Sequence, residues 1–299
     1  MKNMRSFVAA LAHKSLVHDA QCDTRSQTFQ SERYEVGVSW NPNRMHRASM
    51  EDIHGCYLDL GTPRPQALFF INDGHSGDEV ARLVGQILPK LFEPIFKQVD
   101  YEIATARISE SGCTNALCLI RDELNDEGPP QKVVYAANVG DTRAVLSCNG
   151  VAVRLTRDHK ATDASEQARV KKSGGAIENG RVNGRYNITR AFGDLQHKRQ
   201  MISVPHVSCA LLDEKEDTHI ILVCDGVTDV LGDQDLVDIV KCHPDVEQSS
   251  TTIVQHALKS GTTDNITCIV VKLLPTSVKS KATEAVLDKQ ALPRLSRAL

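Results

Sequence analysis

Residues 67–77 read Ala-Leu-Phe-Phe-Ile-Asn-Asp-Gly-His-Ser-Gly, an apolar run that ends at an aspartate and a glycine. A short continuous apolar run bounded by turn-forming residues is typical of a strand buried on both faces. Residues 220–226, Ile-Ile-Leu-Val-Cys-Asp-Gly, repeat this pattern. The two stretches therefore predict interior strands whose ends each carry a carboxylate beside a glycine.

Further strands are predicted around these two stretches. Val133 to Ala137 and Ile266 to Val271 are also short and apolar and predict interior strands. Tyr34 to Ser39 alternates apolar and polar residues, as a half-buried strand does. Strands and helices mix without a regular strand-helix-strand alternation, which favours an α+β fold over a doubly wound parallel sheet.

Four helices are predicted between the strands. Asp163 and Glu166 have the spacing of a capping box, which indicates a helix start. Pro89 and Pro94 must interrupt or kink the longest candidate. The predicted helices span residues 78–97, 163–172, 233–241 and 249–258.

Acidic residues stand at the ends of the predicted strands. Asp73 and Asp225 each precede a glycine, and Asp141 follows one. Asp264 stands just before a strand, and the pair Glu51-Asp52 lies just before another. Each of these residues alone is ordinary in a turn. Five acidic positions at one edge of a packed core would repel one another unless cations lie among the carboxylates.

The ligand type indicates which cations these would be. At the strand ends the candidate ligands are oxygen atoms, with His75 as the exception, and oxygen ligands select Mg²⁺, Mn²⁺ or Ca²⁺. Two such ions about 3.5–4 Å apart, sharing a carboxylate and a water, produce a nucleophile for phosphate-ester hydrolysis. The glycines beside Asp73 and Asp225 permit close backbone approach, and a glycine carbonyl can itself be a ligand.

Composition argues against several other classes of function. The formal net charge is −3 and only 4% of the 299 residues are aromatic, which argues against nucleic acid as a partner. The nine cysteines include no Cys-x-x-Cys pair, and there is no Cys-x5-Arg motif of a cysteine nucleophile. No apolar stretch approaches the ~18 residues of a membrane span. We expect a reduced cytoplasmic protein without a membrane partner, with nuclear and organellar locations left open.

Eight short motifs occur in order within residues 34–273. They are RASMED at 47–52, FFINDGHSG at 69–77, SGCT at 111–114, ANVGDTRAVL at 137–146, LTRDHK at 155–160, GRYNITRAFGD at 184–194, CDGVTDVL at 224–231 and SGTTDNIT at 260–267. Through these motifs the chain resembles the metal-dependent protein Ser/Thr phosphatases of type 2C.

The resemblance implies a four-layer α-β-β-α sandwich, two packed antiparallel sheets flanked by helices, with the site in a cleft at one end. It implies a phosphatase domain at 32–274, with a flap at about 156–190. We expect residues 1–31 to be an irregular N-terminal extension and 275–299 to be a C-terminal tail. The segment from Gly77 to Ser111 is shorter than is usual in the family, so we expect a missing or truncated helix on one outer face.

The resemblance also implies a ligand set for two ions, Mg²⁺ or Mn²⁺. Asp73 would bridge the two ions. Glu51 and the carbonyl of Gly74 would bind one ion, and Asp225 and Asp264 would bind the other.

The remaining site residues are assigned by resemblance too. Asp52 would orient water, and Arg47 would hold the substrate phosphate, because a guanidinium matches two phosphate oxygens at once. His75 would be the general acid that protonates the leaving Ser or Thr oxygen. Asp141 and Asp229, with Asp225, match positions that hold a third, weaker ion in some members, although both also suit a turn and a helix start.

Three functions remain open on these residues. The first is an active, monomeric protein Ser/Thr phosphatase that acts on phosphoproteins through a water bridging the metals. The second is a catalytically silent, phosphatase-like binding module, which would be expected to have lost ligands. The third is a hydrolase of small phosphate esters that uses the same site. The flap has eight basic residues against four acidic ones, which would help to attract a phosphoprotein or form only a solvated face.

Overall fold

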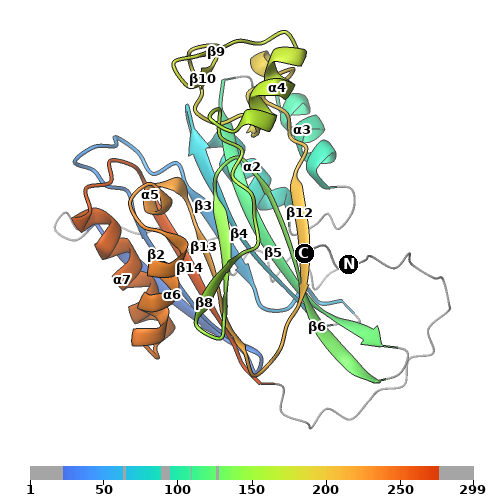
Figure 1. Ribbon diagram of the computed structural model, residues 1–299, viewed down its shortest axis with the longest axis vertical. Helices are drawn as coiled ribbons and strands as arrows, with labels where there is room; N and C mark the ends of the chain where they lie inside the picture. Colours follow the sequence, from blue (N-terminus) through green and yellow to red (C-terminus); the bar gives the residue numbers. More distant parts are fainter. Residues whose placement is uncertain (1–22, 63–64, 89–94, 109, 126–127, 276–299) are drawn as a thin grey trace.

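The computed structural model describes residues 23–62, 65–88, 95–108, 110–125 and 128–275, which form two stacked sheets covered by helices (Figure 1). The first sheet has the order β1 (Arg25–Gln30), β2 (Tyr34–Asn41), β14 (Ile266–Leu273), β13 (Asp217–Val223), β7 (Arg143–Cys148) and β8 (Val151–Arg154). The second has the order β12 (His206–Leu211), β6 (Gly128–Val139), β5 (Gly112–Asn125), β4 (Gln66–His75) and β3 (Ile53–Tyr57), and β11 (Phe192–Gly193) also pairs with β5. The strand pairs within both sheets are antiparallel.

Helices cover the outer face of each sheet. The second sheet carries α2 (Glu79–Ile87) and α3 (Ile95–Thr105), two short helices in place of the predicted 78–97, while Pro89 and Pro94 lie outside the described residues. The first sheet carries α6 (Asp233–Cys242) and α7 (Val246–Lys259), preceded by one turn, α5 (Asp225–Thr228). The expected four-layer sandwich is confirmed. Among the described residues, none of the helices has both the length and the apolar character needed to cross a bilayer.

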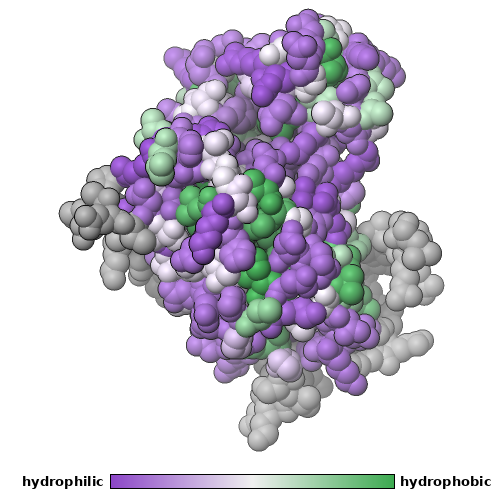
Figure 2. Space-filling model, turned by 60° about the vertical axis from the view of Figure 1, so that its left-hand side comes forward, coloured by the Kyte–Doolittle hydropathy of each residue, from purple (hydrophilic) through white to green (hydrophobic). Residues whose placement is uncertain are grey.

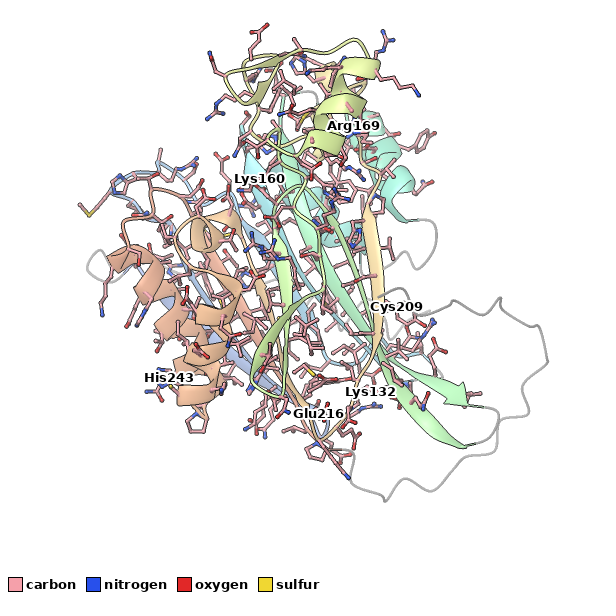
Figure 3. The ribbon with its side chains drawn as sticks, viewed as in Figure 1. Lys132, Lys160, Arg169, Cys209, Glu216 and His243 are labelled. Atoms are coloured by element: carbon pink, nitrogen blue, oxygen red, sulfur yellow. The ribbon has the colours of Figure 1, made fainter. Side chains whose placement is uncertain are left out.

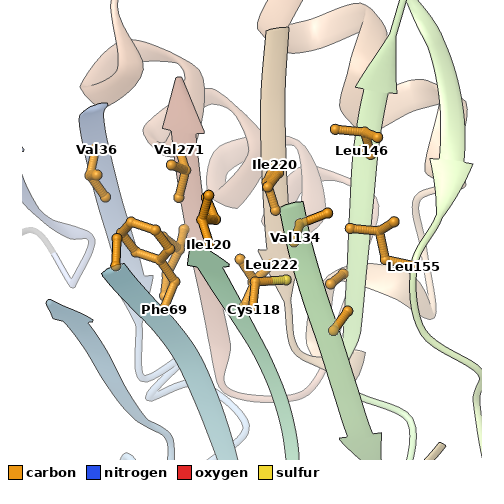
Figure 4. Close-up of a cluster of buried hydrophobic side chains, with 14 of the residues drawn as sticks. Val36, Phe69, Cys118, Ile120, Val134, Leu146, Leu155, Ile220, Leu222 and Val271 are labelled. Atoms are coloured by element: carbon orange, nitrogen blue, oxygen red, sulfur yellow. The ribbon is translucent and has the colours of Figure 1, made fainter. Parts of the chain in front are cut away.

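The position of β4 between two apolar cores explains why its sequence is continuously apolar. Phe69 and Ile71 point between the sheets, where Phe69, Cys118, Ile120 and Val134 of the second sheet face Val36, Val271 and Leu222 of the first (Figure 4). Leu68 and Phe70 point the other way and pack under Val80 and Val84 of α2. Alternate side chains therefore enter two different cores, so neither face of β4 can be polar.

The expectation that Tyr34–Ser39 is half-buried is wrong. Gly37 and Ser39, on its polar side, are buried and face α7, while Glu35 stays partly exposed and pairs with Lys272. A Cβ on Gly37 would overlap the backbone carbonyl of Val246, and Ser39 Oγ lies 2.8 Å from Ser250 Oγ. Small and hydrogen-bonding side chains thus let the helix lie directly on the strand.

The expectation of irregular structure over 1–31 is wrong for Arg25–Gln30. These residues form the edge strand β1, which pairs with β2 along its length. Phe29 is its one large apolar side chain and packs against the core between the sheets. Backbone pairing with β2, and not an apolar pattern, holds this strand. Residues 1–22 and the predicted tail from 276 onward lie outside the described residues.

The flap contains α4 (Ala164–Lys172), β9 (Ile177–Glu178) and β10 (Arg181–Val182) and lies over one end of the sandwich (Figure 1). Asp163 caps α4 by accepting from the amides of Ser165 and Glu166. The carboxylate of Glu166 does not complete the capping box but binds Arg169 and Arg190, 2.9 Å from Arg169 Nη2. Burial raises the pKa of Glu166, but hydrogen bonds from Arg190, Thr189 and Arg169 outweigh it and lower the pKa to about 2. Both ion pairs lie within the flap and hold α4 against its end at Arg190.

Candidate active site

The acidic residues of the five predicted segments converge at one end of the sandwich. A carboxylate oxygen of Asp52, one of Asp73 and the sulfur of Cys224 all lie within 4.8 Å of one another. Asp225, in the first turn of α5, acts electrostatically on both Asp73 and Asp264. The strand β4 extends beyond Asp73 to His75, because Asp73 pairs with Thr114 and His75 with Gly112. Asp73 therefore lies inside a paired strand, which holds its backbone rigidly.

The two Asp-Gly pairs are explained by close approach of other acidic segments. A Cβ on Gly74 would overlap the backbone carbonyl of Glu51. A Cβ on Gly226 would overlap the carbonyl of Asn265 and lie 3.3 Å from Cβ of Asp264. Because only glycine leaves this room, each Asp-Gly pair brings a second acidic segment against the first.

Asn265 joins the two halves of the acidic site, a role that the sequence analysis missed. Its Oδ1 accepts from the amide of Glu51 at 2.9 Å. Its Nδ2 donates to the carbonyls of Pro42 at 2.7 Å and Ser49 at 2.9 Å. Asn265 thereby holds the segment that carries Arg47 and Glu51 against the start of β14.

Without a bound cation, ionising the carboxylates of this site costs free energy. Burial, and then Asp225, Asp52, Asp264 and Asp141, raise the pKa of Asp73 well above its usual range. Burial and the neighbouring Asp141 and Asp264 do the same to the pKa of Asp225. Burial raises the pKa of Asp52 to about 6, despite a hydrogen bond from Thr267 Oγ1 at 2.6 Å. These directions are those of carboxylates that share a site without enough positive charge.

Unsatisfied atoms show where positive charge would fit. Oδ1 of Asp52 and Oδ1 of Asp225 are buried and have no hydrogen-bond partner in the part of the chain that the structure describes. A buried oxygen without a partner is costly, and a hard cation satisfies it. The donors are mostly carboxylate oxygens, which Mg²⁺ and Mn²⁺ prefer. The residues therefore fit the divalent ions expected from the sequence.

Cys224 belongs to the same cluster, although the sequence analysis treated it as an apolar core residue. Thr267 donates its amide to the sulfur at 3.1 Å. Burial, followed by Asp52 and Asp73, raises the pKa of the thiol well above its usual range. The sulfur therefore stays protonated and is a poor ligand and a poor nucleophile.

Asp141 and Asp229 share the side-chain ammonium of Lys160. The Lys160 Nζ lies 3.3 Å from Oδ2 of Asp141 and 3.2 Å from Oδ1 of Asp229. The Asp141 side chain is only 1% exposed, and burial raises its pKa while Lys160 lowers it. Lys160 is the last residue of the motif at 155–160 and lies just below α4, β9 and β10 (Figure 3). The pair assigned to a third ion is thus already partly neutralised.

Replacing Lys160 by Met should strengthen divalent-ion binding at Asp141 and Asp229, because Met is of similar length but uncharged. We expect a Mn²⁺ site about tenfold tighter in calorimetric titration of the metal-free protein. Lys171→Met, on the exposed surface of α4, is the matched control and should bind Mn²⁺ like the unchanged chain. Identical Mn²⁺ titrations for both variants would contradict this role of Lys160.

The proposed phosphate-binding Arg47 lies at the exposed rim of the site. Its Nη2 forms an ion pair with Oδ2 of Asp264, and its Nε donates to the Thr263 carbonyl at 3.3 Å. Its side chain is 46% exposed. Glu51 lies nearby and accepts from Ser49 Oγ at 3.1 Å. Arg47 is therefore held at the edge of the acidic cluster while part of its guanidinium remains open to solvent.

His75 lies on the flap side of the site. Its Nε2 is 2.8 Å from Oδ2 of Asp194, a buried residue to which the sequence analysis gave no role. The ring of Tyr186, from the flap, meets the His75 ring edge-on at 6.1 Å between centroids. Above these residues the visible face of the flap is mostly hydrophilic (Figure 2).

Comparison with known proteins agrees with this arrangement. The family model described as "Protein phosphatase 2C" matches residues 36–266. Protein phosphatase 2C homolog 1 of Saccharomyces cerevisiae is 35% identical over 83% of this chain and 97% of its own. Protein phosphatase 2C homolog 1 of Schizosaccharomyces pombe is 34% identical over 83% of this chain and 76% of its own.

Solved structures share the fold. The crystal structure of serine-threonine phosphatase 2C from Toxoplasma gondii superposes with a TM-score of 0.66 at 18% identity, covering 84% of this chain and 99% of that one. A C. elegans sex determining protein gives a TM-score of 0.66 at 23% identity, covering 80% of this chain and 65% of that one.

Proposed function

Because the chain belongs to the protein phosphatase 2C family and is a metal-dependent protein serine/threonine phosphatase, we propose which of its residues perform each part of that reaction. The observation that carries the proposal is the set of buried, mutually repelling carboxylates on separate segments at one end of the sandwich. A catalytically silent module would not be expected to keep such a costly cluster. All the acidic ligands expected from the sequence are present.

We assign the metal ligands as follows. Asp73, Glu51, the Gly74 carbonyl, Asp225 and Asp264 would hold two Mg²⁺ or Mn²⁺ ions. Asp141 and Asp229 would contribute to a third, weaker site. When bound, the ions supply Lewis acidity toward the phosphate and lower the pKa of water. Within the described part of the chain, Oδ1 of Asp225 and both carboxylate oxygens of Asp141 are buried without a hydrogen bond, which supports this assignment.

The chain's own side chains complete the reaction. Arg47 would bind the phosphate of the substrate through the solvent-facing part of its guanidinium. His75 would give a proton to the Ser or Thr oxygen as that oxygen leaves phosphorus. Asp52, held by Thr267, would orient the attacking water.

The substrates that we propose are phosphoserine and phosphothreonine in proteins. The excess of basic residues on the flap supports a phosphoprotein over a small phosphate ester. We propose a monomeric chain that acts in the cytoplasm, with the phosphatase domain expected at 32–274 extended at its start to include β1. The formal charge of −3 supports neither nucleic acid nor a membrane surface as partner.

The test is dephosphorylation of a phosphothreonine peptide with Mn²⁺, with and without a chelator. We expect turnover to require Mn²⁺ and to survive iodoacetamide. Of the cysteines that the structure describes, the exposed ones, Cys209 and Cys242, lie outside the site, and Cys224 is a buried, protonated thiol. Loss of turnover after thiol alkylation, with metal binding intact, would contradict a water nucleophile. Hydrolysis of p-nitrophenyl phosphate but not of the peptide would favour the small-ester function.

Replacing Arg47 by Ala should mainly raise KM. The phosphate is charged in both ground and transition states, so Arg47 contributes to binding in both. Arg44→Ala, three residues earlier and half-exposed at 51%, is the matched control. Steady-state kinetics on the phosphothreonine peptide should show the KM effect for Arg47 alone. A fall in kcat with unchanged KM would remove Arg47 from phosphate binding.

A further inference from the structure

Asp194 is a buried carboxylate that contacts His75 and has no part in the reaction as assigned so far. Its Oδ2 lies 2.8 Å from Nε2 of His75. The Asp194 side chain is 1% exposed, whereas that of His75 is 27% exposed. Among the described residues, the other oxygen, Oδ1, is buried without a close hydrogen-bond partner. The Tyr186 phenol also interacts with this carboxylate, and of Asp194 and His75 only His75 reaches solvent.

The backbone around this contact is built to bring the two side chains together. A Cβ on Gly112 would overlap both Oδ2 of Asp194 and Nε2 of His75. A Cβ on Gly193 would overlap the carbonyl of Ser111, and Gly193 has a φ of 72°. Two glycines on paired strands, β5 and β11, thus leave the space that the contact occupies.

Asp194 itself adopts a backbone conformation that costs free energy. Its φ of 48° lies in the left-handed region, where a residue other than glycine is uncommon. Its amide donates to the Ser111 carbonyl at 3.1 Å, which holds it in place. Such outliers persist where the surrounding structure over-determines them, and they gather at functional sites.

Aromatic rings lie beside the contact between His75 and Asp194. The Tyr186 ring lies against both His75 and His197, with 5.4 Å between the centroids of Tyr186 and His197. Burial and the charge of Asp194 raise the pKa of the Tyr186 phenol to about 12, so the phenol stays neutral. The His75 ring is therefore confined by Tyr186 on one side and held by Asp194 at one nitrogen.

We propose that Asp194 is the positioning residue of His75, fixing the proton on Nε2 and directing Nδ1 toward the leaving oxygen. A carboxylate only accepts hydrogen bonds, so Nε2 must donate, and Nδ1 is the one ring nitrogen left for the substrate. In the doubly protonated ring Nδ1 also carries a proton. As the P–O bond breaks, the leaving oxygen keeps the electron pair of that bond and takes the Nδ1 proton, and the ring becomes neutral with its remaining proton on Nε2, against Asp194. This inference rests on the proposed role of His75.

The kinetic test compares Asp194→Asn with Asp122→Asn on two substrates. Asp122 lies at the far end of β5, paired with Arg33, so it carries the same substitution away from the site. For Asp194→Asn we expect kcat on a phosphothreonine peptide to fall about 10- to 100-fold, because Asn no longer enforces one tautomer. On p-nitrophenyl phosphate, whose leaving group needs no proton, we expect a loss of less than about threefold. Asp122→Asn should leave the ratio of the two rates unchanged.

A double variant separates positioning from general damage. In the His75→Ala background, Asp194→Asn should cost nothing further on the peptide, because its effect passes through the missing ring. Equal losses on both substrates, or a full additional loss in the double variant, would overturn the proposal. Calorimetric Mn²⁺ binding should be the same in Asp194→Asn and the unchanged chain.

A measurement on the unchanged chain shows which nitrogen of His75 carries the proton, even if Asp194→Asn does not fold. Long-range ¹H–¹⁵N NMR of the His75 ring, assigned with His75→Gln, should show the neutral ring protonated at Nε2. A proton on Nδ1, or a mixture of tautomers, would overturn the proposal. Absence of Mn²⁺-dependent turnover on either substrate would instead refute the proposed function, and the NMR result would still report on Asp194.

Discussion

Asp73→Asn is expected to abolish most phosphatase activity and, at the same time, to stabilise the metal-free protein. Asp73 is the carboxylate that the other acidic residues surround, and its pKa is raised by burial and by four neighbouring aspartates. Asn keeps the shape but removes the charge that would bind metal. We expect kcat/KM to fall about 10²–10³-fold or more, the scale of removing one electrostatic group from an active site.

The gain in stability follows from the direction of the pKa shift. A carboxylate whose pKa is raised by folding contributes stability at low pH, and this contribution is lost as the pH rises through the raised value. Asn resembles the protonated form at every pH. In a chelator, the Tm of Asp73→Asn should therefore exceed that of the unchanged chain at neutral pH, and the difference should shrink as the pH falls.

Adding Mn²⁺ should reverse the order of these two Tm values. A ligand that binds only the folded state stabilises it, so Mn²⁺ should raise the Tm of the unchanged chain more than that of Asp73→Asn. Asp122→Asn, which removes one partner of the ion pair with Arg33, provides the control and should not gain stability in a chelator. Normal rates with unchanged Mn²⁺ binding in Asp73→Asn would show that the acidic residues are ordinary turn residues and do not bind metal.

His75→Ala should lower kcat on a phosphothreonine peptide by about 10²–10⁴-fold, the usual contribution of a general acid. The same change should have a much smaller effect on p-nitrophenyl phosphate. A Ser or Thr alkoxide needs a proton in order to leave, whereas nitrophenolate is stable as an anion. The contrast between substrates therefore reports the acid role directly.

A surface histidine provides the control for this prediction. His256, exposed on α7, lies outside the acidic site, and His256→Ala should leave both rates unchanged. Stopped-flow or steady-state assays at saturating substrate give kcat for each pair of substrate and variant. Equal losses on the two substrates for His75→Ala would show that His75 positions water or metal and does not donate a proton.

The strands and the acidic positions were predictable because both are local properties. The run from Ala67 to Ile71 is apolar at every position because β4 contributes to two cores, and this leaves a continuous pattern in the sequence. The glycine after Asp73 or Asp225 is likewise visible in the sequence as a neighbour. The resemblance to type 2C phosphatases added the four-layer arrangement of sheets and helices, which no local pattern carries.

Two local patterns gave wrong predictions because the residues in them contact distant parts of the chain. The alternation at Tyr34–Ser39 resembles that of a strand facing water, but the small residues Gly37 and Ser39 make room for α7. The spacing of Asp163 and Glu166 resembles a capping box, but Glu166 is drawn to Arg190, 24 residues later. In both cases a contact with a distant part of the chain replaces the local interaction that the sequence pattern suggests.

What the sequence by itself determined was the α+β class, the interior strands and the acidic residues at their ends, since each depends on residues adjacent in the chain. Only the tertiary structure decided which distant groups those residues meet. Asn265 reaches Glu51, Lys160 lies between Asp141 and Asp229, and Asp194 lies against His75. These contacts depend on strand register and on close approach at glycines such as Gly112. Pairing between segments that are not adjacent in the chain is set by the packing of the whole sandwich, which leaves no period or spacing in the sequence to reveal it.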